Sequence, residues 1–235
     1  MIEKMNNPLV SVIMVVKNGE HFIKSAVESV FKQIHQPMEI IVVDGQSNDR
    51  TAEIAKTIQG VKYIYQHDQG LANARNKAIE LSMAKFIAFL DYDDIWLPNK
   101  LSKQIDHLVS FPDIQATITW LRFIIEPEYF LQYSSIQNNY QKDQIGYTPS
   151  ALVARKELFQ KIGLFDPVFS SGCDLDWFAK LTDSNYPISI IPEVLLYKRI
   201  HDSNLSLNIS QNKKEMMLVL RNSLIRKRNS KSKNG

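Results

Sequence analysis

Four short apolar runs in the first 110 residues constrain the fold of this 235-residue chain more than any other feature. Residues 9–16 read LVSVIMVV and residues 38–43 read MEIIVV, which is typical of strands buried on both faces. The two further runs are residues 61–65 and 85–90. Segments with helical spacing of apolar residues follow the four runs, at about 20–34, 51–58, 71–82 and 98–109. This alternation predicts a parallel sheet with helices on both faces.

After residue 110 the alternation becomes irregular. We expect strands at residues 116–125, 147–154, 188–191 and 194–199, and helices at 156–162, 174–182 and 212–228. Residues 126–144 are polar and rich in Tyr, Gln and Asn, which predicts a loop. We therefore expect one α/β domain whose regular half ends near residue 110, and a basic helix and tail over residues 207–235.

The composition is that of an ordinary globular protein. Hydrophobic residues make up 44% and charged residues 23%, which excludes collagen-like and disordered chains. Cys173 is the single cysteine, so no disulfide can form within the chain. The sequence has no run of 18 apolar residues, and its first residues lack the basic and apolar segments of a signal peptide. We expect a cytoplasmic protein.

The formal net charge of +3 conceals an uneven distribution of charge along the chain. Residues 213–235 carry eight Lys or Arg residues and one acid, which leaves 20 basic and 24 acidic residues in the first 212. The acidic body argues against nucleic acid as the main partner, because nucleic-acid binding requires a basic face. The basic helix with its apolar residues is compatible with two arrangements. It can make peripheral contact with an anionic membrane, or it can pack on the body and end in a disordered tail.

Three carboxylates follow the fourth apolar run within four residues, as Asp91-Tyr92-Asp93-Asp94. Because ligands bind beyond the carboxyl ends of strands in parallel sheets, this position favours a binding site. Buried carboxylates so close together need a cation or must bind protons. Mg²⁺ prefers oxygen ligands and keeps room for substrate phosphates. The alternative is an N-terminal cap for the helix after Pro98, but a cap requires only one acid.

Further polar residues are candidates for a site. Asp44 ends the second strand and is followed by Gly45, so its carboxylate can contact a base or a ribose, or close a simple turn. Asp174 and Asp176 lie two residues apart on a predicted helix and therefore diverge. Either can be a general base, or the pair can cap the helix. His201 follows basic residues and is a candidate for contact with a metal ion or a diphosphate.

The glycine motifs that bind phosphates are absent from the sequence. The first strand is followed by Val16-Lys17-Asn18-Gly19 rather than G-x-G-x-x-G, and G-x-x-x-x-G-K-[ST] does not occur. NAD-dependent enzymes and P-loop NTPases are therefore disfavoured. The acidic residues together favour a metal-dependent reaction on a nucleoside diphosphate compound.

Six motifs occur in a fixed order along the chain. They are SVIMVVKNG at residues 11–19, VVDGQSNDRT at 42–51, HDQGLANARN at 67–76, FLDYDD at 89–94, GLFD at 163–166, and YKRIHDSNLS at 197–206. This set resembles family 2 glycosyltransferases of the GT-A fold, over about residues 8–206. FLDYDD matches the family's D-x-D metal motif. Asp174, within the sequence GCDLDW, lies where the family has its catalytic aspartate.

The resemblance implies an α/β chain of the GT-A, or nucleotide-diphospho-sugar transferase, fold. This fold has a Rossmann-like, mostly parallel sheet flanked by helices, here with a C-terminal extension on the acceptor side. Residues 8–110 would be the nucleotide-binding half and residues 111–206 the acceptor half. The implied reaction moves a sugar from a nucleotide-diphosphate sugar, with a UDP-sugar favoured, to a hydroxyl of a saccharide or lipid-linked acceptor. The anomeric configuration would invert. The setting would be cell-surface polysaccharide or glycolipid synthesis, and the basic helix is compatible with peripheral contact at the inner face of the membrane.

The resemblance also implies a role for each candidate residue. Asp174 would be the catalytic base, and Asp93 and His201 would bind Mg²⁺ or Mn²⁺. Asp176 and Trp177 would lie on the acceptor side. Asp44 would contact the base and Asp91 the ribose, so that the implied nucleotide-binding residues are Val16, Asn18, Asp44, Arg75 and Asp91.

Two residues depart from the family pattern. Gly45 stands where the family often has a second Asp, and Cys173 stands where it usually has Glu before the catalytic aspartate. The second departure leaves open a non-catalytic nucleotide- or sugar-binding module of the same fold. A nucleotidyltransferase is a further alternative, but it would be expected to carry a basic, glycine-rich loop after the first strand, which this chain lacks.

Overall fold

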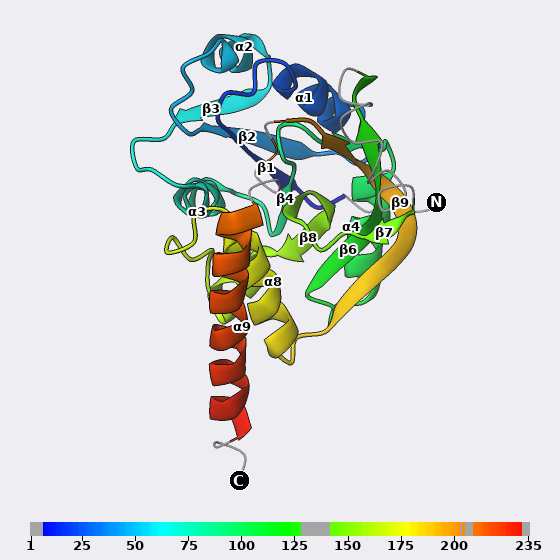
Figure 1. Cartoon of the computed structure of the whole chain (residues 1–235). Coiled ribbons are helices and arrows are strands. Elements are labelled where there is room, and N and C mark those ends of the chain that lie inside the picture. Colours follow the sequence, from blue (N-terminus) through cyan, green and yellow to red (C-terminus); the bar gives the residue numbers. More distant parts are fainter. Residues whose placement is uncertain (1–6, 128–141, 203, 205–208, 232–235) are drawn as a thin grey trace, which may run out of the picture.

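The structure, a computed structural model, describes residues 7–127, 142–202, 204 and 209–231. Within this part of the chain, nine strands form one sheet in the order β3-β2-β1-β4-β8-β6-β9-β5, with β7 paired to β6 (Figure 1). Helix α3 packs on β1 and β2, and α4 packs on β6, β8 and β9. The predicted α/β fold with a mostly parallel sheet is therefore confirmed.

Parallel strands and their connecting helices make up the first half of the sheet. The elements are β1 (Val10–Val16), α1 (Ile23–Phe31), β2 (Met38–Asp44), α2 (Thr51–Thr57), β3 (Val61–Tyr65), α3 (Leu71–Leu81) and β4 (Phe86–Phe89). All pairings among these strands are parallel, and β1 lies between β2 and β4. The register places Val16 opposite Asp44 and Asp44 opposite Tyr65, so these strands end at the same edge of the sheet.

The second half contains shorter elements and antiparallel pairings. They are β5 (Ile95–Trp96), α4 (Lys100–Ser110), β6 (Ala116–Ile125), β7 (Gln144–Ile145), the 3-10 turn η3 (Pro149–Ala151), β8 (Leu152–Arg155), α7 (Lys156–Ile162), α8 (Cys173–Asp183), β9 (Ile188–Ile200) and α9 (Ile209–Lys231). Strand β8 runs antiparallel between β4 and β6 and joins the two halves into one sheet.

Four elements of this half differ from the prediction, one of them the two-residue strand β7, which was not predicted. Residues 188–200 form one strand rather than two, because the pairing of β9 with β6 passes over Pro192 and Glu193 in a bulge. The strand predicted at 147–154 begins as a 3-10 turn at Pro149, which has no N–H for a strand ladder. The two-residue strand β5 was not predicted. The loop predicted at 126–144 lies mostly outside the described residues.

The core lies around β1, β2 and β4, whose apolar side chains are buried on both faces. Helix α1 buries the apolar face that its spacing predicts and packs against β5 and α2. Helix α3 contributes small residues, which allow it to lie close to the sheet. The buried residues of these two helices include Ile23, Ala26, Val27, Val30, Ala72, Ala74 and Ala78.

An aromatic cluster fixes α8 against the sheet. The Trp177 ring stacks on Phe159 with 4.7 Å between ring centroids, and Phe165 lies 5.7 Å from Trp177. The indole N–H donates to the Gly163 carbonyl at 3.1 Å, so the polar edge of the ring has a partner. Asn76 at α3 exchanges two hydrogen bonds of 3.0 and 2.8 Å with the backbone of Phe165. The cluster therefore links α3 to the segment that precedes α8.

Helix α9 packs along α8 (Figure 1). It buries Val219 against the body. At its far end Ser223 and Arg226 both donate to Asp183, each at 2.8 Å. The predicted basic helix is thus present and packs on the body. None of the helices in the described ranges has both the length and the apolar character that crossing a membrane requires.

We expect Trp177→Ala to lower the free energy of unfolding by about 4 kcal/mol, because it removes a large buried ring and its hydrogen bond. Urea unfolding followed by circular dichroism measures the change. Leu175→Ala, on the same helix but 45% exposed, is the matched control and should cost less than about 0.5 kcal/mol. Equal losses for the two variants would contradict a core role for Trp177.

Candidate functional site

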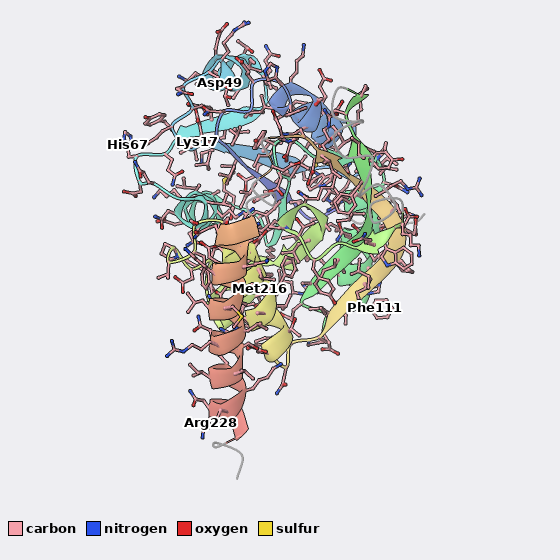
Figure 2. All side chains as sticks on the ribbon, viewed as in Figure 1. Lys17, Asp49, His67, Phe111, Met216 and Arg228 are labelled. Atoms are coloured by element: carbon pink, nitrogen blue, oxygen red, sulfur yellow. The ribbon has the colours of Figure 1, made fainter. Side chains whose placement is uncertain are left out.

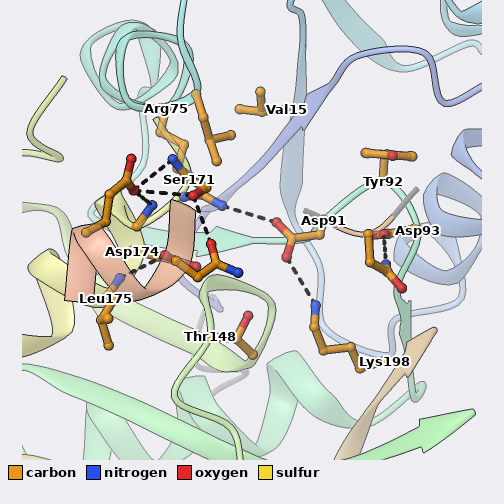
Figure 3. A pocket seen from close by; sticks show the side chains of 15 residues that line it. Val15, Arg75, Asp91, Tyr92, Asp93, Thr148, Ser171, Asp174, Leu175 and Lys198 are labelled. Atoms are coloured by element: carbon orange, nitrogen blue, oxygen red, sulfur yellow. Dashed lines mark hydrogen bonds and ion pairs between the residues drawn. The ribbon is translucent and has the colours of Figure 1, made fainter. Parts of the chain in front are cut away.

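A cavity of about 280 Å³ opens at the carboxyl ends of β1 and β4 (Figure 3). Side chains from α3, α8, β9 and α9 also line it. Its position agrees with the expectation that ligands bind beyond the ends of parallel strands. The charged residues that line it are Arg75, Asp91, Asp93, Asp174, Lys198 and Glu215.

Asp91 lies two residues after the end of β4 and contacts two cations. Arg75 lies 3.3 Å from one carboxylate oxygen and Lys198 lies 3.6 Å from the other. The Asp91 N–H donates to the Ser150 hydroxyl at 2.9 Å, which holds the start of the acidic segment in place. Burial alone would raise the pKa of Asp91, but Lys198 and Arg75 outweigh burial and lower it. Asp91 is therefore a carboxylate that stays ionised inside the cavity.

Asp93 and His201 are in direct contact. The His201 Nε2 atom lies 2.9 Å from Asp93 Oδ2, and the Asn204 amide donates to the same oxygen at 3.0 Å. The Asn204 side-chain oxygen also accepts the His201 backbone N–H at 2.8 Å. This hydrogen bond fixes the backbone that carries the imidazole ring. The Phe22 ring lies 4.6 Å from the imidazole, centroid to centroid.

The donor atoms of Asp93 and His201 fit a divalent cation that the substrate helps to bind. Mg²⁺ is commonly held by one or two carboxylates, with phosphates and waters as the other ligands. In the described part of the chain, no group of three or more His, Cys, Asp or Glu side chains is arranged as a metal site. The pair alone is therefore an incomplete ligand set, which diphosphate oxygens can complete.

Asp94 does not line the cavity. Its carboxylate is fully buried, accepts the Arg199 backbone N–H at 3.3 Å and pairs with Lys198 at 3.2 Å. Burial, together with the neighbouring Asp93 and Asp91, raises the pKa of Asp94 to about 7, although Lys198 acts in the opposite direction. Asp94 does not cap α4, which begins at Lys100 after Asn99 without a side-chain cap. The alternative role predicted for this cluster is thus not observed.

Asp174 lies in the first turn of α8 and its side chain lines the cavity (Figure 3). One carboxylate oxygen accepts the Leu175 N–H at 2.8 Å. Burial raises the pKa of Asp174 above its ordinary value, although Arg75 partly offsets the effect. A carboxylate with a raised pKa accepts a proton more readily, which suits a general base.

Cys173 lies beside Arg75 and is fully buried. The Arg75 guanidinium donates to its Sγ atom at 3.4 Å. Burial raises the pKa of the thiol to about 11, so the residue is neutral at pH 7. The residue that replaces the family's Glu is therefore a neutral partner of Arg75.

Asp176 and Trp177, the two residues expected on the acceptor side, do not line the cavity. Asp176 is 1% exposed and its carboxylate pairs with Lys180 at 2.7 Å and with Arg226 at 3.6 Å. Trp177 belongs to the aromatic cluster. The predicted divergence of Asp174 and Asp176 is thus observed, and Leu175 is the neighbour that reaches the cavity instead.

Val16, Asn18 and Asp44 lie at the adjacent ends of β1 and β2, outside the cavity lining. The Val16 carbonyl accepts the Gly45 N–H at 2.8 Å, and Val15 rather than Val16 reaches the cavity. Asn18 has a φ of 55°, which Asn tolerates, and its N–H donates to Ser47 at 2.9 Å. Asp44 is fully buried and accepts the Tyr63 hydroxyl at 2.8 Å. The loops after β1 and β2 are thus tied to each other.

Sequence reasoning did not identify two charged residues of the cavity. Lys198 lies in the polar segment before His201, where only the histidine was selected. Glu215 is the one acid in the basic C-terminal segment. Its carboxylate accepts the N–H groups of Ser170 at 3.0 Å, Ser171 at 3.1 Å and Gly172 at 2.5 Å. The sequence signal that could have identified Glu215 is that it is the single acid among eight basic residues in segment 213–235.

The family profile "Glycosyl transferase family 2" matches residues 11–163, more than half of the chain. The chain belongs to glycosyltransferase family 2. It is similar to the uncharacterized glycosyltransferase MJ1057 of Methanocaldococcus jannaschii, with 32% identity over 85% of this chain and 73% of that protein. The chain is also similar to WfgD of Escherichia coli, a UDP-Glc:alpha-D-GlcNAc-diphosphoundecaprenol beta-1,3-glucosyltransferase. The identity is 39% over 45% of this chain and 43% of WfgD.

Solved structures show the same GT-A fold. Staphylococcus aureus TarS 1-349 in complex with UDP-GlcNAc matches with a TM-score of 0.74 and 20% identity, over 92% of this chain and 66% of that one. The mannosyltransferase PcManGT of Pyrobaculum calidifontis, in complex with GDP-Man and Mn²⁺, matches with a TM-score of 0.71 and 16% identity, over 94% and 65%. This glycosyltransferase chain thus spans slightly less than two thirds of the length of these two structures.

We expect Glu215→Gln to lower the free energy of unfolding by about 2 kcal/mol at pH 7, because Gln lacks the charge that three N–H groups contact. Burial alone would raise the pKa of Glu215, but its hydrogen bonds lower the pKa from 4.5 to about 2. A lowered pKa means that the carboxylate stabilises the fold fully above about pH 4.5 and loses this effect as the pH falls toward 2.

The difference between wild type and variant should therefore be constant at and above pH 6 and shrink in acid. Urea unfolding at pH 7, 4 and 3 measures it. Glu157→Gln, which removes one exposed partner of Lys161, is the control and should change stability by less than about 0.5 kcal/mol. A Glu215→Gln difference that stays constant down to pH 3 would contradict the assignment.

Proposed function

We propose that this chain transfers a sugar from a nucleoside-diphosphate sugar to an acceptor hydroxyl, with inversion at the anomeric carbon. The observation that carries the proposal is the cavity in which Asp91, Asp93 and Asp174 meet, in a chain of glycosyltransferase family 2. A UDP-sugar is the favoured donor, since the names of WfgD and the TarS complex both include a UDP-sugar. Polysaccharide or glycolipid synthesis, with a saccharide or lipid-linked acceptor, is the proposed setting.

The nucleotide is held at the ends of β1, β2 and β4. Asp44 is the proposed contact of the base, and because its carboxylate is buried and accepts the Tyr63 hydroxyl, this contact requires a movement that exposes it. Asp91 contacts the ribose, and its two cation contacts keep it ionised as a hydrogen-bond acceptor. The backbone around Val16 and Asn18 approaches the nucleotide, and Arg75 holds Asp91 from the side of α3.

Asp93 and His201 hold Mg²⁺ or Mn²⁺ together with the diphosphate of the donor. When bound, the metal offsets the negative charge that grows on the leaving diphosphate. Asn204 and Phe22 keep the His201 ring directed at Asp93. Orientation of the two side chains before substrate binds reduces the reorganisation that binding requires.

Asp174 is the proposed catalytic base. The acceptor oxygen forms a bond to C1 of the sugar as the bond from C1 to the diphosphate oxygen breaks. The hydroxyl proton moves to the Asp174 carboxylate, and the nucleoside diphosphate leaves with the electron pair. The raised pKa of Asp174 favours this proton transfer. The displacement needs one base and no protein nucleophile.

Calorimetric titration with UDP, GDP, CDP, dTDP and ADP, with and without Mn²⁺, tests the proposal. We expect one nucleotide to bind in a metal-dependent manner, and Asp93→Ala to weaken its affinity in Mn²⁺ by about tenfold or more. Asp174→Asn should leave nucleotide affinity within about twofold and lower turnover of the matching nucleotide sugar by about 10² to 10⁴. Glu80→Ala, which alters one exposed pair on α3, is the control and should change neither quantity.

Failure of every nucleotide to bind would refute the donor site. Metal-dependent binding without sugar transfer or donor hydrolysis would instead identify a non-catalytic module of the same fold.

We further propose that the outer face of α9 lies on an anionic membrane surface, which would place the protein at the cytoplasmic face. Glu215 and Val219 face the body, while the other side of the helix exposes apolar and basic residues together. Figure 2 shows Met216 and Arg228 along this helix. The exposed residues include Met217, Leu220, Leu224, Lys213, Lys214 and Arg221. Apolar side chains that enter the interface and bases that contact anionic lipid act together at such surfaces.

Vesicle sedimentation tests this contact. The protein should bind vesicles of phosphatidylcholine with phosphatidylglycerol, and bind less to phosphatidylcholine alone or at high salt. The double variant Met217→Ser, Leu224→Ser should bind at least about fivefold more weakly, because two exposed apolar anchors are lost. Met83→Ser, at a 75% exposed methionine before β4, is the matched control. Unchanged binding by the double variant would remove α9 as the contact.

A further inference from the structure

Glu215 forms hydrogen bonds with three consecutive backbone N–H groups. Its two carboxylate oxygens accept from Ser170, Ser171 and Gly172 at 3.0, 3.1 and 2.5 Å. The Ser170 hydroxyl and the Gln211 amide donate to the same carboxylate at 2.6 and 2.7 Å. Figure 3 shows Ser171 beside the cavity at this network. The carboxylate thus binds the whole turn that leads into α8.

The start of α8 has no side-chain cap of its own. Gly172 occupies the cap position and Cys173 begins the helix. The first N–H groups of a helix lack partners within it, and a negative charge near them is favourable. Glu215 supplies that charge from another helix. A Cβ at residue 172 would lie 2.9 Å from the Glu215 carboxylate, so glycine permits this close approach.

Asp174 lies two residues after the turn that Glu215 holds. The Asp176 N–H donates to the Gly172 carbonyl at 3.0 Å, which closes the first helical turn around Asp174. Trp177 fixes the following turn in the aromatic cluster. Asp174 is therefore held between Glu215 on one side and Trp177 on the other.

We propose that Glu215 of α9 is a positioning residue that holds Asp174 at the reacting bond through the Ser170–Gly172 turn. The inference rests on the proposed role of Asp174 as the base, and it makes the C-terminal helix part of the active site. Misplacement of a catalytic group by about 1 Å can cost about 10²-fold in rate. Loss of the Glu215 contacts should therefore reduce turnover without a change in donor affinity.

The same two helices offer a matched control at the other end of their interface. Asp183 in the last turn of α8 pairs with Arg226 and Lys227 of α9 at 2.8 and 3.3 Å. Asp183→Asn removes a carboxylate from the α8–α9 interface and leaves the Ser170–Gly172 turn unchanged. A general loosening of α9 affects both variants, whereas a positioning role affects Glu215→Gln alone.

The experiment compares amide hydrogen exchange and kinetics in the full chain and in the two variants. Glu215→Gln should accelerate exchange of the Ser170, Ser171, Gly172 and Asp176 amides by about tenfold or more. Asp183→Asn should leave these amides within about twofold of wild type. With UDP-glucose, UDP-GlcNAc and GDP-mannose as donors, Glu215→Gln should lower kcat by at least about tenfold and leave the donor KM unchanged.

Unchanged exchange at Asp176 in Glu215→Gln would overturn the inference, whether or not any of these donors reacts. Faster exchange with an unchanged kcat would also overturn it. So would equal effects on kcat in the two variants, because that result indicates only the docking of α9. The exchange measurement needs no substrate, so it distinguishes failure of this inference from failure of the proposed transferase activity.

Discussion

Three carboxylates lie close together after β4, and their negative charges need basic or hydrogen-bonding partners. The rest of the site depends on this constraint. Asp91, Asp93 and Asp94 occur within four residues, and each contacts a basic or histidine side chain from another part of the chain. Arg75 and Lys198 neutralise Asp91, Lys198 also pairs with buried Asp94, and His201 contacts Asp93. Removal of one partner from a buried ion pair costs about 3–5 kcal/mol, which applies to the fully buried Asp94 and its partner Lys198. The acidic segment therefore requires α3 and β9 to meet at the end of β4.

The antiparallel pairing of β5 with β9 places Lys198 and His201 beside the acidic segment. Ile95, which follows Asp94 in the chain, lies opposite Tyr197, which precedes Lys198. This register places the lysine ammonium beside Asp94 and leads the chain on to His201 three residues later. The short strand β5 is thus the element that joins the acidic segment to the C-terminal part of the domain. The bulge between β6 and β9 lets β9 continue past Pro192 to reach this position.

The parallel half of the fold could be predicted because buried strands and amphipathic helices leave periodic patterns. The four apolar runs are β1 to β4 in the structure, and Asp93 and His201, which the sequence analysis singled out, lie in contact. A two-residue strand such as β5 has no period, and Pro192 interrupts the pattern of β9, so these elements depend on tertiary pairing. The resemblance implied an acceptor-side place for Asp176 and Trp177, but neither residue lines the cavity, because helix geometry turns both side chains away from that of Asp174. Glu215 binds backbone N–H groups, which every residue type except proline offers, so its partners have no sequence signature.

Cys173 stands where the family usually has Glu, and this difference changes which acidic groups interact with the Arg75 guanidinium. A carboxylate at residue 173 would lie against the buried guanidinium, whereas the neutral thiol only accepts a weak hydrogen bond from it. Arg75 then acts mainly on Asp91, whose pKa it lowers, and on Asp174, where it limits the rise that burial causes. Asp174 still enters the cavity, because the Ser170–Gly172 turn and the Trp177 cluster determine its position. The substitution thus alters the electrostatics around the proposed base while the placement of that base rests on contacts that do not involve residue 173.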